Sequence, residues 1–305
     1  MLLYSHESAL RHQTPAGHPE RVDRVLAVER GLAGIKLDRR TAPMADEADI
    51  LRCHPARHLA RIRAAEPASG TTQLDADTWM SPGSFEAASR AVGGACAAVD
   101  AVLDGAAKAA FVLARPPGHH AETEKPLGFC LFGTVAIAAK KALTRLKRVA
   151  VVDFDVHHGN GTQDLLWDEK RVLFITSQQM PLWPGTGQRS ERGAHGQILN
   201  LPLAPGSDGG VMRKAYEAEV FPALAAFKPE LVLISAGFDA HADDPLAGLG
   251  WLADDYGWLT GRLCDLADEH AQGRVVSCLE GGYDLDALTA SVAAHVGVLQ
   301  ERSDG

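Results

Sequence analysis

Residues 148–163, RVAVVDFDVHHGNGTQ, join a short apolar run to a group of polar residues. The run at 149–152 is short and mostly β-branched, which is typical of a buried strand in a parallel sheet. Asp153, Asp155 and His157 follow at alternate positions, so an extended backbone would direct all three side chains to one side. A divalent metal such as zinc is a suitable partner for two buried carboxylates and an imidazole. Taken alone, the motif is equally compatible with a solvated loop after a strand.

Other parts of the chain repeat this arrangement of an apolar run followed by polar residues. Residues 109–114, 231–236 and 274–279 are predicted to be buried strands, and helical stretches separate them. The polar residues that follow the four predicted strands are His119 and His120, Asp155 and His157, Asp239, and Tyr283. Ligands of parallel α/β sheets bind outside the carboxyl ends of the strands. We therefore expect these side chains to converge on one site.

Composition limits the classes of function that the chain can serve. With 305 residues, 46% of them hydrophobic, it is long enough for one large α/β domain or two small ones. A formal net charge of −9 argues against nucleic acid as a partner, because phosphate binding requires a basic face. The five cysteines include no CxxC pair, which favours a reducing compartment, and we expect a cytoplasmic protein. No apolar run is long enough for a signal peptide or a membrane span, so no membrane association is expected.

Several other histidines have weaker signals. His6 and His12 lie in a polar stretch and are interpreted as surface-loop residues. Residues 48–65 are predicted to be helical, and His54 and His58 are four residues apart within them, a spacing that can bind metal on a helix. Because no glutamate stands between them as it does in HExxH, we interpret both as ordinary helix histidines.

Seven motifs together resemble the histone deacetylase family, including its bacterial amidohydrolases. They extend over nearly the whole chain: HPER at 18–21, RPPGHHAE at 115–122, GFCLF at 128–132, VDFDVHHGNGTQ at 152–163, PGTG at 184–187, GFDAHADDPLAGL at 237–249 and EGGYDL at 280–285. HHGNGTQ and GFDAH are more similar to the class II branch than to class I. The resemblance implies one catalytic domain over residues 1–305, an arginase-like three-layer α/β/α fold around a parallel sheet of about eight strands.

The resemblance also implies a zinc-dependent active site. Asp155, His157 and Asp239 correspond to the ligands of one catalytic zinc, which keeps open coordination for water and substrate. His120 corresponds to the general base that deprotonates the water and then protonates the leaving amine. His119 would assist His120 electrostatically or share the proton transfer with it. The residues would then form the site of a hydrolase that acts on linear amides.

Three further residues have roles implied by the same resemblance. Asp153 would hold His119, and Asn160 would hold His120. Because Asn160 is an amide, it would stabilise a charged imidazole less than a carboxylate would. Tyr283 would donate its hydroxyl to the developing oxyanion.

The resemblance further implies a substrate tunnel and a second cation site. The tunnel would be lined by Asp77, Gly128, Phe129, Trp183 and Leu246. A structural potassium ion would be held by Asp153, Asp155 and His157 together with Thr176.

Three positions depart from the family pattern. Gly133 replaces the first residue of a pair that is usually Asn-rich, Gln178 stands where many relatives have histidine, and Trp183 is larger than the common Phe or Tyr. None of them removes a ligand, a catalytic histidine or the tyrosine. They bear on the shape of the tunnel and on the choice of substrate.

The motifs leave more than one possible substrate and function. Removal of acetyl or other acyl groups from N-acyl-lysine side chains of a protein or peptide is favoured, because the segment between His18 and His54 lacks the insertion of polyamine-specific relatives. An acetylpolyamine or another small acetylated amine is the second candidate. A silent binding module is disfavoured because the motif set, including Tyr283, is complete. An arginase-like manganese enzyme would need a richer Asp and His set for two metals. The chain can form an oligomer in any of these cases.

Overall fold

A single sheet of eight parallel strands forms the centre of the computed structural model, which describes residues 1–304, with side chains for 1–303. The strand order is β2-β1-β5-β10-β9-β6-β7-β8. A separate antiparallel pair joins β3 (Thr72–Gln73) to β4 (Trp79–Met80). The strands of the large sheet are β1 (Leu2–Ser5), β2 (Asp38–Thr41), β5 (Ala109–Val112), β6 (Val149–Asp153), β7 (Val172–Gln179), β8 (Ile198–Leu203), β9 (Val232–Ala236) and β10 (Val275–Leu279).

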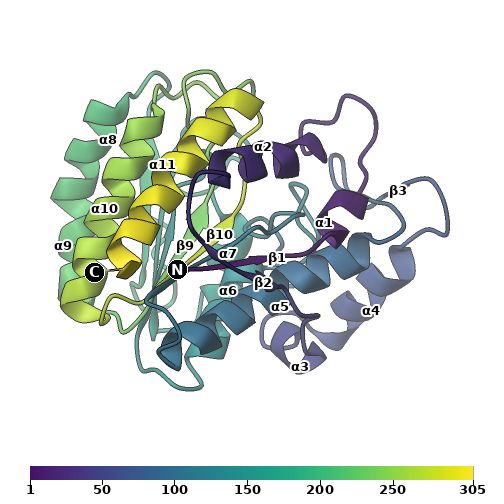
Figure 1. Cartoon of the computed structure of the whole chain (residues 1–305), viewed down its shortest axis with the longest axis horizontal. Coiled ribbons are helices and arrows are strands. Elements are labelled where there is room, and N and C mark those ends of the chain that lie inside the picture. Colours follow the sequence, from purple (N-terminus) through teal and green to yellow (C-terminus); the bar gives the residue numbers. More distant parts are fainter. Residues whose placement is uncertain (305) are drawn as a thin grey trace.

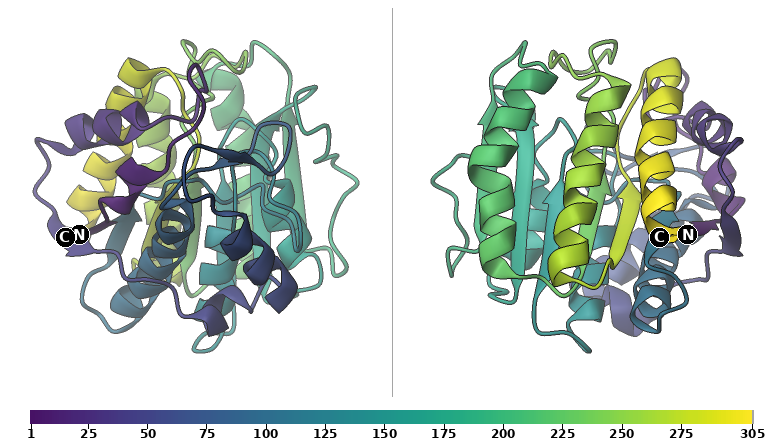
Figure 2. Two further views of the ribbon diagram at one scale, coloured as in Figure 1. Left: turned by 90° about the vertical axis from the view of Figure 1, so that its right-hand side faces the viewer. Right: turned by 60° about the vertical axis from the view of Figure 1, so that its left-hand side comes forward.

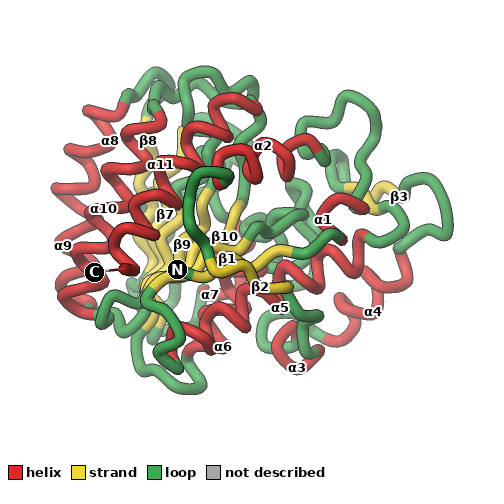
Figure 3. Tube along the Cα trace, viewed as in Figure 1, coloured by secondary structure: helices red, strands yellow, loops and turns green. Residues whose placement is uncertain are grey.

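Helices cover both faces of this sheet, so the molecule has three layers (Figure 1; Figure 3 shows the yellow strands between the red helices). One face packs against α2 (Asp23–Leu32), α8 (Gly209–Ala215), the π-helical turn η1 (Tyr216–Val220), α9 (Phe221–Phe227), α10 (Ala253–His270) and α11 (Leu285–Asp304). The other face packs against α3 (Glu47–Ile50), α4 (Ala56–Ala65), α5 (Ser84–Leu103), α6 (Thr134–Ala142) and α7 (Asn160–Leu166). The short α1 (Ser8–Arg11) follows β1. Figure 2 shows α9, α10 and α11 standing side by side over their face. The predicted fold class is confirmed.

The apolar run that opens β6 explains why this strand lies in the middle of the molecule. Val149 and Val151 belong to the core on the α5–α6 face, whereas Ala150 and Val152 belong to the core on the α10–α11 face. Successive side chains of a strand point to opposite faces, so a strand covered on both sides must be apolar at every position. Asp153, the last residue of β6, is fully buried.

Two predictions about local structure are wrong. The expected helix over residues 48–65 is two helices, α3 and α4, and His54 lies in the connection between them. Pro55 follows His54, and a residue before proline is disfavoured in the α region. His12 is not on the surface but only 1% exposed, because its Nδ1 lies 2.7 Å from Ser84 Oγ and its Nε2 lies 3.5 Å from the buried carboxylate of Glu20.

The strand order places the predicted site strands next to one another. β5, β10, β9 and β6 are consecutive in the sheet, and all are parallel, so their carboxyl ends meet at one edge. Within residues 1–304, no helix has the length and the apolar content that a membrane span requires.

Candidate metal centre and active site

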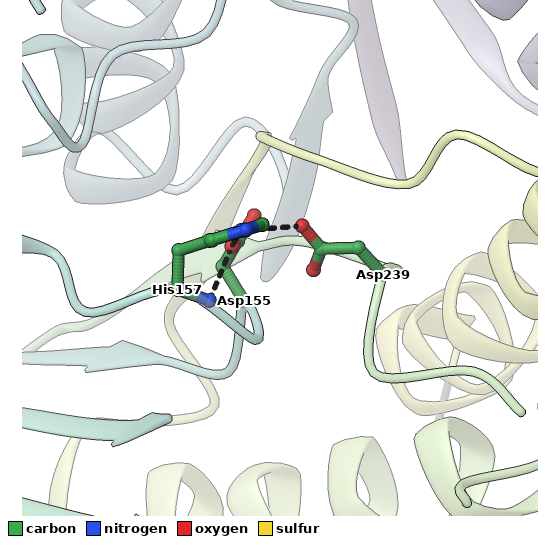
Figure 4. A group of neighbouring side chains, drawn as sticks. All are labelled: Asp155, His157 and Asp239. Atoms are coloured by element: carbon green, nitrogen blue, oxygen red, sulfur yellow. Dashed lines mark hydrogen bonds and ion pairs between the residues drawn. The ribbon is translucent and has the colours of Figure 1, made fainter. Parts of the chain in front are cut away.

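Three side chains form a group that fits a metal ion at this edge. Asp155 and His157 follow β6, and Asp239 follows β9. One ligand atom from each of the three lies within 4.8 Å of the others. His157 Nδ1 is 3.2 Å from Asp155 Oδ1 and 3.1 Å from Asp239 Oδ2, as Figure 4 shows. Two carboxylates and one imidazole are a donor set that suits zinc.

The convergence of Asp155 and His157 has a different origin from the one predicted. β6 ends at Asp153, so the two residues lie in a loop and not on an extended strand. The loop turns because Asp155 N–H donates to Asp153 Oδ1 at 3.1 Å and His157 N–H donates to Asp155 Oδ1 at 2.9 Å. Aspartate side chains commonly stabilise turns by accepting from the backbone two residues on. The alternate spacing of Asp153, Asp155 and His157 therefore brings the ligand side chains together through turns of the backbone and not through an extended strand.

Two glycines leave room for the ligand carboxylates. A Cβ on Gly281 would lie 2.4 Å from Asp239 Oδ2 and 2.5 Å from Asp155 Oδ2. A Cβ on Gly237 would lie 2.0 Å from Asp155 Oδ2. Gly281 N–H also donates to Asp155 Oδ2 at 2.9 Å. Only glycine fits at these two positions, and the GFD and EGG motifs supply it.

The electrostatics of the ligand group favour a cation. Burial alone would lower the pKa of His157, but its hydrogen bonds to Asp155 and Asp239 raise that pKa to about 10. Burial raises the pKa of Asp239 to about 6, and the charge of Asp155 adds to this effect. The ligand position is thus at a strongly negative potential, which a divalent cation would neutralise. The residues fit the predicted zinc.

The adjacent histidines His119 and His120 have different partners. His119 Nδ1 lies 2.9 Å from Asp153 Oδ2, and His120 Nδ1 lies 2.7 Å from Asn160 Oδ1. Asn160 Nδ2 donates to Glu122 Oε1 at 2.8 Å, which fixes the orientation of the amide. Because Asn160 Oδ1 can only accept, His120 carries its hydrogen on Nδ1 and has Nε2 free to accept a proton.

These partners separate the pKa values of the two imidazoles. Burial alone would lower the pKa of His119, but nearby carboxylates, chiefly Asp155 and Asp153, raise it well above its ordinary value. Burial lowers the pKa of His120 well below its ordinary value, and His119 and His157 lower it further. The carboxylates therefore favour the charged form of His119, whereas burial favours the neutral form of His120. A neutral imidazole beside a metal position can act as a base.

Glu280 supports the histidine turn from β10. Its Oε2 accepts from Gly118 N–H at 2.7 Å and from His119 N–H at 3.2 Å. Its Oε1 accepts from Ser235 Oγ at 3.0 Å. The carboxylate thus links β10, β9 and the turn after β5. The sequence indicated no role for Glu280 beyond its place in EGGYDL, because two of its partners are backbone groups 161 and 162 residues away.

Tyr283 reaches the same site from the end of β10. It is 9% exposed, and its ring centroid lies 5.9 Å from that of Phe129. The Arg24 guanidinium lies 5.0 Å from the centre of the tyrosine ring, and Arg24 Nε donates to the carbonyl of Gly282 at 2.7 Å. Burial raises the pKa of Tyr283 well above its ordinary value, so the hydroxyl keeps its proton and can donate.

A pocket of about 350 Å³ opens above these residues. Its wall includes all five predicted tunnel residues: Asp77, Gly128, Phe129, Trp183 and Leu246. It also includes His120, His157 and Tyr283. Five further residues line the pocket and were not predicted to do so: His18, Pro19, Ala76, Trp79 and Leu182. His18 and Pro19 belong to the HPER motif. Ala76 and Trp79 lie close to Asp77 in the chain, and Leu182 precedes Trp183, so nearness to a predicted tunnel residue could have indicated these three.

The three departures from the family pattern have structural partners. Gln178 Nε2 donates to the carbonyl of Gly187 at 2.7 Å, which anchors the PGTG loop. Gly133 N–H donates to His54 Nε2 at 2.9 Å, and a Cβ there would lie 2.2 Å from Leu165 Cδ1. Trp183 is 41% exposed, and its ring centroid is 4.7 Å from that of His120. Of the three, only Trp183 shapes the pocket directly.

The predicted potassium ligands are neighbours. Thr176 is buried on β7 and pairs with Asp153 in the β6–β7 register. Asp155 and His157 follow Asp153 in the chain. The identity of a cation at this place stays a prediction.

Comparisons with known proteins agree with the geometry. The chain matches the histone deacetylase domain family over residues 18–299. It is 44% identical over 301 residues to an uncharacterized protein, slr0245, of Synechocystis sp., covering 95% of this chain and 96% of that one. It is 41% identical over 280 residues to the histone deacetylase-like amidohydrolase of Pseudomonas aeruginosa, covering 88% and 73%. The solved HDA15 HD domain superposes with a TM-score of 0.92 at 32% identity, covering 98% of this chain and 90% of the other.

The family match extends over most of the chain, and the fold match extends over nearly all of it. The matched region contains the candidate metal ligands Asp155, His157 and Asp239, the adjacent histidines His119 and His120, and Tyr283. The chain belongs to the histone deacetylase family.

Proposed function

We propose that this protein is a zinc-dependent deacylase that hydrolyses N-acyl-lysine side chains of proteins or peptides. One observation carries the proposal: His157, which groups with Asp155 and Asp239 as a possible metal ligand, lines the same pocket as His120 and Tyr283. A metal position, a neutral base and a protonated donor thus surround one space. These are the functional groups that metal-assisted hydrolysis of an amide requires.

Asp155, His157 and Asp239 would hold the zinc, which when bound supplies a Lewis acid for the amide carbonyl and for a water. His120 Nε2 takes the proton of the attacking water, because Nδ1 already donates to Asn160. The same nitrogen then gives the proton to the leaving amine. The pairing of His119 with Asp153 favours the charged form of His119, and this disfavours a second charge on His120 before the reaction.

Tyr283 acts on the carbonyl oxygen of the amide. Its raised pKa keeps the hydroxyl protonated, so it donates to the oxygen as negative charge develops there. Phe129 and Trp183 line the pocket and would shield the substrate stem from water. A drier site strengthens each electrostatic contact within it.

The lining favours a substrate with an uncharged stem. Among the described lining residues, Asp77 is the single carboxylate beyond the metal group, and aromatic and aliphatic side chains form most of the wall. The stem of an acyl-lysine is a plain alkyl chain, whereas an acetylpolyamine carries ammonium groups that prefer acidic partners. The second candidate is an acetylpolyamine, because Asp77 could meet one ammonium at the wall.

One kinetic comparison tests the substrate assignment. The zinc-loaded protein is assayed with an acetyl-lysine peptide, acetylputrescine and acetylspermidine in one buffer, and kcat/KM is measured for each. We expect the peptide to be preferred. A polyamine preferred by tenfold or more, about 1.4 kcal/mol of transition-state stabilisation, would replace the peptide proposal. No turnover of any amide by metal-loaded protein would support a binding module instead.

The accompanying assignments are also proposals. Zinc as the resident metal can be tested by metal analysis of the purified protein. Potassium at Asp153, Asp155, His157 and Thr176 can be tested by the dependence of the melting temperature on potassium and sodium. A cytoplasmic location is in keeping with five buried cysteines that are all free thiols.

A further inference from the structure

Asp244 is a buried carboxylate that the proposed reaction does not use. It lies in the loop after β9 and is 6% exposed. Its Oδ2 accepts from Tyr283 N–H at 2.7 Å and from Asp284 N–H at 3.4 Å. Its Oδ1 accepts from Leu246 N–H at 3.0 Å. Among residues 1–304, the Asp244 carboxylate accepts from these three backbone N–H groups and forms no ion pair.

Two of the three residues whose N–H groups donate to Asp244 line the pocket, namely Tyr283 and Leu246. Tyr283 supplies the hydroxyl that would donate to the substrate carbonyl, and Leu246 forms part of the wall. A single carboxylate thus ties a wall residue to the backbone of the reacting residue, although 39 positions separate Asp244 from Tyr283. Burying an acid without a cation is unfavourable, so the three N–H groups must compensate for the lost hydration.

The backbone of Tyr283 needs such support because its neighbour allows several conformations. Gly282 has φ of +115°, a region that only glycine adopts readily, and glycine by itself does not fix the chain that follows. Arg24 holds the carbonyl of Gly282 on one side at 2.7 Å. Asp244 holds the N–H of Tyr283 on the other. The position of the phenol hydroxyl depends on both anchors.

We infer that Asp244 is a positioning residue that sets the place of the Tyr283 hydroxyl in the pocket. The kinetic test of this inference rests on the proposed function, because it measures turnover. The structural test needs only the position of the Tyr283 side chain. A displacement of about 1 Å at a reacting group can lower a rate by about 100-fold. Asp244→Asn keeps the shape of the side chain but turns an NH₂ toward one of the N–H donors, so one of the bonds is lost.

The kinetic test is a double-mutant cycle. Asp244→Asn should lower kcat by about 10- to 100-fold and change KM by less than about threefold. In a Tyr283→Phe background, the same substitution should lower kcat by less than about threefold, because the hydroxyl that it displaces is already absent. Losses that multiply would mean that Asp244 acts on the whole fold, and this result would overturn the inference. An unchanged kcat in the single variant would overturn it as well.

Two further variants control for charge and folding. Asp243→Asn removes the same charge from the same loop, but the Asp243 side chain is 75% exposed, so kcat should stay within about twofold of wild type. Asp244→Ser keeps a short acceptor for the local turn at Leu246 but cannot span the distance to Tyr283 N–H. It should reproduce the kcat loss, and it replaces Asp244→Asn in the cycle if that variant does not fold.

A structural measurement separates this inference from the proposed function. Crystal structures of the wild type and of Asp244→Asn, both loaded with zinc alone, should differ in the distance from the Tyr283 hydroxyl to Asp239 and His157 by about 1 Å. A tyrosine that does not move overturns the inference whether or not the protein has activity. A wild type that hydrolyses no acyl-amide, while Tyr283 moves in the variant, overturns the proposed function and leaves the positioning role in place.

Discussion

A buried histidine outside the active site should control the acid stability of the protein. His295 lies on α11, fully buried between the helix and the sheet. Its Nδ1 is 2.6 Å from Thr260 Oγ1 and its Nε2 is 2.8 Å from Ser277 Oγ. The aromatic rings of Phe154 and Phe238, which precede Asp155 and Asp239 in the chain, both have centroids 5.7 Å from the imidazole.

Burial lowers the pKa of His295 from 6.5 to about 3. Above pH 6.5 the imidazole is neutral in both the folded and the unfolded chain, so it imposes no penalty on folding. Below pH 6.5 the His295 imidazole binds a proton in the unfolded chain but not in the folded protein. The free energy of unfolding therefore decreases as the pH falls toward 3. The loss is about 1.4 kcal/mol for each pH unit, or about 2 kcal/mol at pH 5.

The assay is the free energy of unfolding, measured by denaturant titration at several values between pH 5 and 7. His295→Gln does not titrate, so its stability should depend less steeply on pH than that of the wild type, by about 1.4 kcal/mol per unit near pH 5. Thr260→Val is the control, because it removes one hydrogen-bond partner and keeps the imidazole. It should lower stability and leave the slope unchanged. Equal slopes in wild type and His295→Gln would refute the reasoning.

Three substitutions test the active site itself. Asp239→Ala should abolish stoichiometric zinc binding, and full metal content with full turnover would remove Asp239 from the ligand set. His120→Ala should lower kcat by about two to four orders of magnitude while metal stays bound, as expected for a lost general base; near-normal turnover of a metal-loaded variant would exclude that role. Asn160→Asp should raise the pKa of His120 by about one unit or more, because a carboxylate favours the charged imidazole. The acidic limb of the pH–rate profile should therefore move to higher pH, and a limb that stays in place would show that His120 is not the group that titrates there.

The sequence predicted the strands of the fold whose residues are mostly apolar. β6, β9 and β10 are such strands, because helices cover both of their faces. β2 was not predicted, since its residues DRRT are all exposed at the edge of the sheet and have no apolar pattern. β8 was also missed; it is the opposite edge strand and contains Pro202, which a central strand would not tolerate.

The same distinction applies to the site. The proposed ligands and acid–base residues could be found because each follows a recognisable strand, and parallel strands bring their ends together. Asp244 and Glu280 could not, because they act on backbone N–H groups that are far away in the chain. A backbone N–H is present at nearly every residue, so the sequence contains no signal for such a bond. Three-dimensional structure is needed to find supporting residues of this kind.

The two active-site histidines illustrate how neighbouring residues of one type acquire different chemistry. His119 and His120 are adjacent, equally buried and only 3.9 Å apart between ring centroids. Their Nδ1 atoms face different partners, a carboxylate from Asp153 and an amide from Asn160. Asp155 and Asp153 favour the charged form of the His119 ring, whereas burial lowers the pKa of His120 and the neighbouring His119 and His157 lower it further. Burial, the neighbouring charges and the Nδ1 partners together therefore give two adjacent imidazoles different affinities for a proton.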